Sequence, residues 1–254
     1  MIKFFRKTRQ QLMAANQTSK YLKYAIGEIL LVVVGILLAL YINNWNTHRA
    51  ERKQEVKLLE QIKADVQANQ NEIQRLKKVV GSIQEASDNV IESLERKEKF
   101  PYFNISASVL HRKYYLKNSS SGYTMLNNGL ITLIQNTDLR NDIIQLYEST
   151  YLDLITREQW MLDYLDQSLN PQSNRLFKIQ ENMEINIPDM DETSFDVFAP
   201  INFGLLSENI EYINTLKAMR KMNALRMIAI ESAELKSTEV LKALELNLQQ
   251  LHKR

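Results

Sequence analysis

The fold of this chain follows from residues 59–94, which read LEQIKADVQANQNEIQRLKKVVGSIQEASDNVIESL. Apolar side chains recur there at alternating intervals of three and four residues, the spacing of a coiled-coil seam on one helix face. The seam residues are Leu59, Ile62, Val66, Asn69, Ile73, Leu76, Val80 and Ile83, followed by Ser87, Val90 and Leu94. Because residues 49–99 contain no Pro and one Gly, the pattern predicts a long helix over residues 46–99.

Two packings fit this seam. In the first, the last helix of the chain folds back on the first one, which makes an antiparallel bundle within one chain. In the second, two chains pair in parallel as a homodimer. A polar seam residue such as Asn69 is a device that fixes register or strand number in either packing.

A second helix signal precedes the seam. Residues 25–42 read AIGEILLVVVGILLALYI, and 18 helical residues reach roughly 27 Å, close to the ~30 Å hydrocarbon core of a bilayer. Aromatic residues at both edges, Tyr24 before the run and Tyr41 and Trp45 after it, are typical of the membrane interface. The pattern predicts a transmembrane helix over residues 25–45 that continues into the long helix.

The flanking charges predict the orientation of this anchor. Residues 1–24 carry six basic and no acidic residues, so this segment is expected in the cytoplasm or along the inner leaflet of the bilayer. No small-x-small cleavage site follows the apolar run, which favours an uncleaved anchor over a signal peptide. Residues 46–254 are then expected outside a bacterial inner membrane, in the periplasm.

Several anchor residues are candidates for assembly with another membrane helix. Glu28 is the one ionisable residue in the apolar run, where a carboxylate is costly and often functional. It is interpreted either as a partner for a basic residue on another helix or as a side chain that reaches the headgroups near Lys23. Small residues that permit close helix contact lie nearby, and polar or aromatic residues mark the outer edge. These residues are Gly27, Gly35, Ala39, Tyr41, Asn43, Asn44 and Trp45.

The remainder of the chain also reads as helical. We expect short helices over residues 105–136, including an apolar-periodic segment at 107–116, and a helix over residues 138–169 capped by Thr137 or Asp138. Residues 184–206 read as a surface connection that could hold a short strand pair. Ser207 is expected to cap a last helix over residues 207–251. The predicted fold class is all-α, an anchor helix continuing into an antiparallel extracytoplasmic helical bundle.

Composition and motifs argue against most chemistries. The absence of Cys removes disulfides, thiolate zinc sites and cysteine nucleophiles. The net charge of +2 does not indicate a nucleic-acid binder. His48, His111 and His252 are isolated, the acidic loop at residues 189–192 lacks the rest of a calcium loop, and no phosphate-binding or nucleophile motif occurs. The prediction is no enzyme, no metal and no cofactor.

One cluster on the last helix has two interpretations. Met219, Met222 and Met227 alternate with Lys217, Arg220, Lys221 and Arg226. Methionine-rich basic faces can serve as adaptable binding surfaces. The alternative, and the favoured one, is that the methionines fill the core beside solvated basic side chains.

The anchor and a later segment resemble a known family. Residues 24–46 read YAIGEILLVVVGILLALYINNWN, and residues 121–148 read SGYTMLNNGLITLIQNTDLRNDIIQLYE, which is similar to a looser family pattern, "Leu-x-x-x-Gly-x-Leu-x-Leu-Ile-x-Asn…Leu-Arg…Tyr". Together they resemble a large domain-of-unknown-function family of uncharacterised bacterial single-pass membrane proteins. The resemblance implies an inner-membrane location with a helical outer domain, and it brings no activity, cofactor or catalytic residue.

Two functions remain open from the sequence. The favoured hypothesis is a membrane-anchored scaffold or interaction protein that contacts the bilayer and associates with itself or with a second membrane protein through Glu28. The alternative is a ligand-sensing or accessory subunit, which would need a separate transmembrane partner for its output. A polar pocket between the 139–169 and 207–251 helices would favour sensing, and a fully packed bundle would favour the scaffold.

Overall fold

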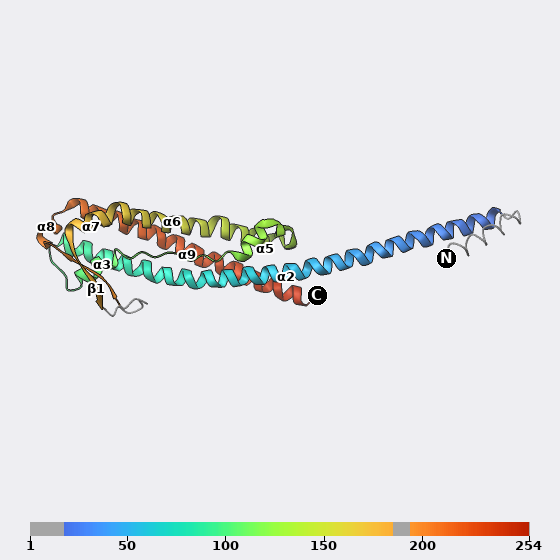
Figure 1. The fold of residues 1–254 in the computed structure, drawn as a ribbon, viewed down its shortest axis with the longest axis horizontal. Helices are drawn as coiled ribbons and strands as arrows, with labels where there is room; N and C mark the ends of the chain where they lie inside the picture. Colours follow the sequence, from blue (N-terminus) through green and yellow to red (C-terminus); the bar gives the residue numbers. More distant parts are fainter. Residues whose placement is uncertain (1–17, 185–193, 254) are drawn as a thin grey trace. The chain divides into compact units, whose positions relative to one another are not determined.

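The computed structural model describes residues 18–184 and 194–253 (Figure 1). The basic residues 1–17 and the acidic loop at residues 189–192 therefore lie outside the described residues. The chain divides into two compact units, Met1–Glu55 and Val56–Arg254. The long helix α2 (Thr18–Glu95) contributes to both units, and all other described elements belong to the second.

The second unit is a bundle of long helices, which confirms the predicted fold class. Residues 56–95 of α2 pack against α9 (Ile210–His252), and α9 also packs against α5 (Thr137–Gln145) and α6 (Leu152–Tyr164). Two π-helical turns, η3 (Leu146–Tyr151) and η4 (Leu165–Leu169), join α5, α6 and α7 (Asn170–Leu176) into a nearly continuous rod. Figure 1 shows that α2, the rod from α5 to α7, and α9 lie side by side along the bundle.

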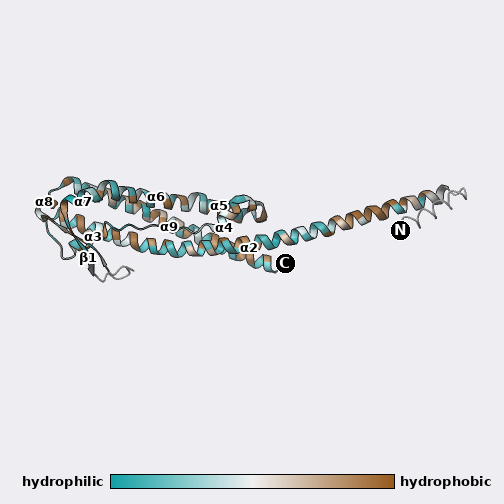
Figure 2. Cartoon of the chain, viewed as in Figure 1, coloured by the Kyte–Doolittle hydropathy of each residue, from teal (hydrophilic) through white to brown (hydrophobic). Residues whose placement is uncertain are grey.

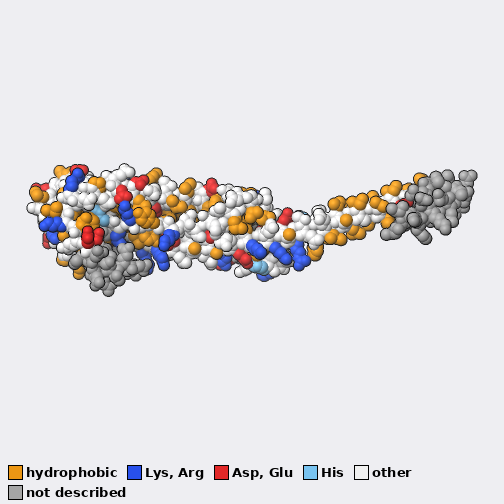
Figure 3. Space-filling view, viewed as in Figure 1, with side chains coloured by type: hydrophobic (Ala, Val, Ile, Leu, Met, Phe, Trp, Pro, Cys, Tyr) orange, Lys and Arg blue, Asp and Glu red, His pale blue; other side chains and the backbone are white. Residues whose placement is uncertain are grey.

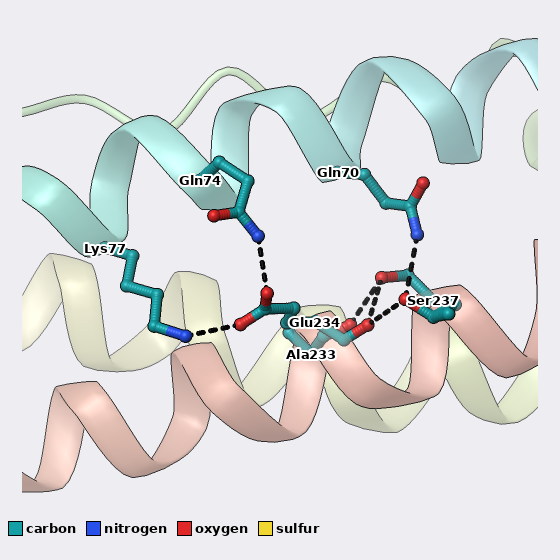
Figure 4. A network of polar contacts seen from close by, with 7 residues as sticks. Gln70, Gln74, Lys77, Ala233, Glu234 and Ser237 are labelled. Atoms are coloured by element: carbon teal, nitrogen blue, oxygen red, sulfur yellow. Dashed lines mark hydrogen bonds and ion pairs between the residues drawn. The ribbon is translucent and has the colours of Figure 1, made fainter.

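Cross-helix ion pairs show that α2 and α9 run antiparallel. Residue numbers rise along α2 as they fall along α9 through a series of surface contacts. These contacts, called the α2–α9 ladder below, are Lys63–Glu245, Lys77–Glu234, Asp88–Arg220 and Glu95–Lys217. Figure 4 shows the middle of this ladder, where Glu234 accepts from Gln74 Nε2 at 2.5 Å and from Lys77 Nζ at 2.6 Å. The ladder is consistent with one register of the antiparallel packing.

Three helix ends differ from the expected ones: the N-termini of α5 and α9 and the C-terminus of α2. Asn136 and Asn209 accept hydrogen bonds from Leu139 N and Tyr212 N, so they cap α5 and α9 in place of Thr137 and Ser207. At the other end, α2 stops at Glu95 rather than at residue 99. Lys97 adopts the left-handed conformation (φ 56°), and Glu98 N bonds to Ser93 O at 3.0 Å, which is a Schellman motif without the usual glycine.

Residues 103–133 are less helical than predicted. The short helix α3 (Phe103–Val109) is followed by residues 112–120, which have no regular structure and lie along α2 and α6 as an extended strap. The helices α4 (Ser121–Met125), η1 (Leu126–Leu130) and η2 (Ile131–Leu133) complete this part. The strap sequence ends in Asn118-Ser-Ser120, residue types that favour side-chain bonds to other groups over a helix.

The connection between α7 and α9 contains a strand pair and a short helix. Strand β1 (Phe177–Glu184) pairs antiparallel with β2 (Ser194–Pro200), with Phe177 opposite Pro200 and a register shift between Gln180 and Met183. The hairpin therefore begins at residue 177, ahead of the connection expected over residues 184–206. Helix α8 (Phe203–Ser207) follows it, and β2 packs against α3.

The core consists of two apolar clusters stacked along the bundle. The first contains α2 residues up to Val80, α6 residues up to Leu154 and α9 residues from Ala229 onward. The second contains α2 residues from Ile83, α6 and η4 residues from Met161, and α9 residues up to Met219. A polar layer that contains Glu158 and Arg226 lies between the two clusters.

Candidate functional site

The residues of the predicted anchor lie on an exposed segment of α2. The apolar segment of α2 has a mean hydropathy of 2.6 and no buried residues, and it is the one helix among the described residues that is long and apolar enough to cross a membrane. Figure 2 shows this segment as a continuous brown stretch of α2, and Figure 3 shows its hydrophobic side chains. A helix turns about 100° per residue, which places Glu28, Gly35 and Ala39 within about 40° of one another. Gly27 lies about 80° from Gly35 and so falls off this face.

The C-terminal end of the apolar segment carries the predicted aromatic and amide residues. Tyr41, Asn43, Asn44 and Trp45 are all exposed. The Arg49 guanidinium lies 5.6 Å from the centre of the Trp45 ring, a cation–π contact one turn along the helix. Thr47 Oγ1 donates to the Asn43 carbonyl at 3.1 Å. Polar and aromatic residues therefore follow the apolar segment directly along α2.

The seam residues of α2 are buried inside the bundle of a single chain. Their exposed fractions are at most 3%, and the apolar members belong to the two core clusters with residues of α6 and α9. Of the two packings that the seam allows, the structure has the antiparallel bundle. A homodimer through these side chains would require the bundle to open.

Asn69 binds the strap. Its Nδ2 donates to Ser119 O at 2.8 Å, and its Oδ1 accepts from Ser119 N at 2.7 Å, so the amide pairs with the backbone as a neighbouring strand would. One turn earlier, the buried Asp65 carboxylate accepts from Ser119 Oγ, Ser121 Oγ and Gly122 N at 2.8, 2.9 and 2.6 Å. The polar seam residue thus fixes the path of the strap within one chain.

The polar layer between the core clusters is a buried ion pair that the sequence interpretation missed. Arg226 Nε and Nη2 donate to the two Glu158 oxygens at 2.8 and 2.5 Å, and Arg226 Nη1 donates to Asn223 Oδ1 at 2.7 Å. Both charged side chains are 5% exposed, so the expectation that Arg226 is solvated is wrong. Met219 is buried in the core, as expected.

The sequence does contain a signal for this pair, in the spacing of the residues on α6 and α9. Buried α9 residues fall at 219, 223, 226 and 230, and those of η3 and α6 at 151, 154, 158 and 161, the same three-four spacing as in α2. Arg226 and Glu158 occupy core-facing positions in these series, and opposite charges in facing stripes of adjacent helices predict pairing.

The interior between α6 and α9 is densely packed. A cavity there has room for about a single water, near 10 Å³, and is lined by residues that include Glu158, Met161, Met219 and Arg226. Among the described residues, no group of three or more acidic or His side chains is arranged to hold a metal ion. This region of the bundle is a core.

A larger polar cleft lies at the hairpin end of the bundle. It has a volume of about 370 Å³ and is formed by α3, the start of the strap, α7 and β2. Its lining residues are Ser108, His111, Arg112, Asn170, Asn174, Asp196 and Phe198. His111 looks isolated in the sequence because Asn170 and Phe198, which its ring contacts, are 59 and 87 positions away.

Hydrogen bonds define the chemical state of His111. Asn170 Nδ2 donates to Asp166 Oδ1 at 3.0 Å, which turns Asn170 Oδ1 toward His111 Nδ1 at 2.8 Å. Since a carbonyl oxygen only accepts, Nδ1 carries the proton. Burial lowers the pKa of His111 to about 4, and its ring stacks on Phe198 at 4.0 Å, so the imidazole is neutral at pH 7.

Comparison with known proteins identifies the family alone. No curated protein and no solved structure matches the chain. A family model described as a family of unknown function (DUF6090) matches residues 28–203, more than half of the chain. The match includes α2 from Glu28 onward, the strap and the hairpin, and it ends before α9. The resemblance to a domain-of-unknown-function family is thereby confirmed, and the chain belongs to the family DUF6090.

Proposed function

We propose that this protein is a membrane-anchored helical scaffold that holds its bundle at the outer face of a bacterial inner membrane. The dense packing between α6 and α9 favours a scaffold over a ligand sensor with its site in that interior, because the cavity of about 10 Å³ there admits no more than water. Anchoring is supported by the exposed apolar segment, which belongs to the same helix as the seam, and by the basic residues that precede it.

Cysteine labelling tests the anchor and its orientation. The natural chain has no Cys, so an introduced residue is the one thiol to react. We expect Gln249→Cys, on the exposed end of α9, to react with a membrane-impermeant maleimide on intact spheroplasts. Thr8→Cys in the basic segment should react only after the membrane is permeabilised. Labelling of both variants without permeabilisation would contradict the cytoplasmic N-terminus, and recovery of the full-length chain in the soluble fraction would contradict the anchor.

The scaffold proposal includes a partner helix on the Glu28 face. Glu28, Gly35 and Ala39 share this face, and small residues let a second helix approach closely enough for a basic side chain to reach the carboxylate. Glu28 also takes part in an interaction within the chain. A partner with a basic residue near the cytoplasmic edge of its span fits this surface.

Isolation of the complex from native membranes tests this partner. After gentle extraction of the tagged full-length chain, we expect a second membrane protein in stoichiometric amount. Glu28→Gln should lose most of it, because the amide carries no charge to pair. Leu30→Gln, which places the same amide about 200° around the helix, is the matched control and should retain it. An unchanged complex with Glu28→Gln, or a homo-oligomer alone, would rule out assembly through Glu28.

A further inference from the structure

The cleft at the hairpin end has the size and the preformed walls of a ligand site. Its volume of about 370 Å³ lies within the range of roughly 300–1,000 Å³ that is common for small-molecule pockets. Water occupies about 30 Å³ per molecule, so the cleft has room for about a dozen non-hydrogen atoms. This is the size of an amino acid or a monosaccharide.

Internal contacts hold the walls of the cleft in place. Ser108 Oγ on α3 accepts from Phe198 N at 2.8 Å, which fastens β2 to α3. On the opposite side, Lys113 Nζ pairs with Asp166 at 2.6 Å, and Asp166 in turn accepts from Asn170, which holds His111. A ligand would therefore meet walls that need little ordering, which lowers the entropic cost of binding.

The charges in the cleft restrict the class of ligand. Arg112 and Asp196 are its two charged lining residues, and they have opposite signs. Both interact within the chain. A guanidinium has five donors and a carboxylate two oxygens with about four lone-pair sites, so a ligand would share these groups with their present partners. His111 is neutral, and the carboxamides of Asn170 and Asn174 can donate or accept. The formal charges cancel, so an anion or a cation alone would meet an opposing charge as well as a favourable one.

We propose that this cleft binds a small zwitterion of the α-amino acid class. The ligand carboxylate would pair with Arg112, its ammonium with Asp196, and its remaining polar atoms with the carboxamides of Asn170 and Asn174. The site is separate from the Glu28 face and from the packed interior between α6 and α9, and it does not depend on the membrane anchor.

Thermal unfolding of the full-length chain in detergent tests the site. The probes are L-glutamine and L-alanine as zwitterions, acetate as an anion, ethylamine as a cation and glucose as a neutral polyol. At a concentration about tenfold above Kd, we expect a zwitterion to raise Tm by about 3 °C, and the other probes to leave Tm unchanged. Calorimetric titration then measures Kd for the probe that acts.

Three variants make the test specific. Asp196→Asn alters an exposed residue of β2 and should weaken amino-acid binding at least about tenfold without affecting the core. Arg112→Gln should do the same, and Arg112→Lys should restore part of the affinity because the charge remains. Arg220→Gln breaks the surface pair with Asp88 on the α2–α9 ladder and should leave Kd unchanged.

Three outcomes would overturn the proposal. One is that neither amino acid shifts Tm or produces heat on titration. Another is that acetate, ethylamine or glucose acts as strongly as the amino acids, which would assign the cleft to a different ligand class. The third is that Asp196→Asn and Arg112→Gln both bind as the natural chain does, which would place the binding elsewhere.

Discussion

The Glu158→Gln variant is expected to lose about 3–5 kcal/mol of the free energy of unfolding, the usual cost of removing one partner from a buried ion pair. Arg226 is 4% exposed, and its remaining hydrogen bond to a neutral group is the one to Asn223 Oδ1. A guanidinium cannot lose its proton at ordinary pH, so its charge would stay buried without compensation. Urea unfolding of the full-length chain, followed by circular dichroism at 222 nm, measures the loss.

A double variant separates the cost of the orphaned charge from the value of the pair. Glu158→Leu combined with Arg226→Met removes both charges and refills the layer, so its stability should return close to that of the natural chain. The matched control is Asp153→Asn, because Asp153 is 53% exposed where it pairs with Arg157 on the same helix; this variant should lose much less than Glu158→Gln. Equal losses from Glu158→Gln and Asp153→Asn would contradict a buried pair.

The Gly122→Ala variant is expected to destabilise the fold by about 3 kcal/mol, at the upper end of the usual cost of overpacking. A Cβ at this position would lie 2.7 Å from Ile62 N and 3.0 Å from Ile62 Cα, which belong to the backbone of α2 and cannot rotate away. To relieve the contact, α4 would have to move off α2. That movement would stretch the 2.6 Å bond from Gly122 N to Asp65.

Gly81 supplies the matched control for this variant. It lies in the interior of α2, and a Cβ there would meet nothing within 4 Å. Gly81→Ala should therefore stabilise the chain by about 0.5–1 kcal/mol through helix propensity. Urea unfolding compares the two variants, and limited proteolysis of the strap locates the damage in Gly122→Ala. A Gly122→Ala variant that unfolds at the same urea concentration as the natural chain would show that α4 and α2 do not approach so closely.

The parts of the fold that the sequence predicted well are those dominated by a local period. The three-four spacing from Leu59 to Leu94 depends on the pitch of one helix, so it can be read without any partner, and all of its members are buried. The strap was harder to predict. Residues 107–116 have helical spacing, yet residues 112–120 are extended because Asn69 and Asp65, about 50 residues earlier, bind the backbone and hydroxyls of Ser119 and Ser121.

The candidate sites also divide into those that spacing on one helix predicts and those that it does not. The shared face of Glu28, Gly35 and Ala39 follows from their spacing on one helix, whereas the cleft and the Glu158–Arg226 pair require residues from different elements. His111 looked isolated in the chain because its neighbours Asn170 and Phe198 are 59 and 87 positions away. No spacing rule connects residues so far apart.

By itself, the sequence determined the helical class, the apolar segment at residues 25–42 and the face of α2 that enters the core, because each depends on interactions within a few turns of one helix. Tertiary structure alone decided that the seam is covered by α6 and α9 of the same chain, that residues 112–120 form a strap, and that Arg112 and Asp196 line one cleft. These features depend on which surfaces meet after the chain folds back, and that choice is made by the free energy of the packed whole, in which contacts distant along the chain count as much as near ones.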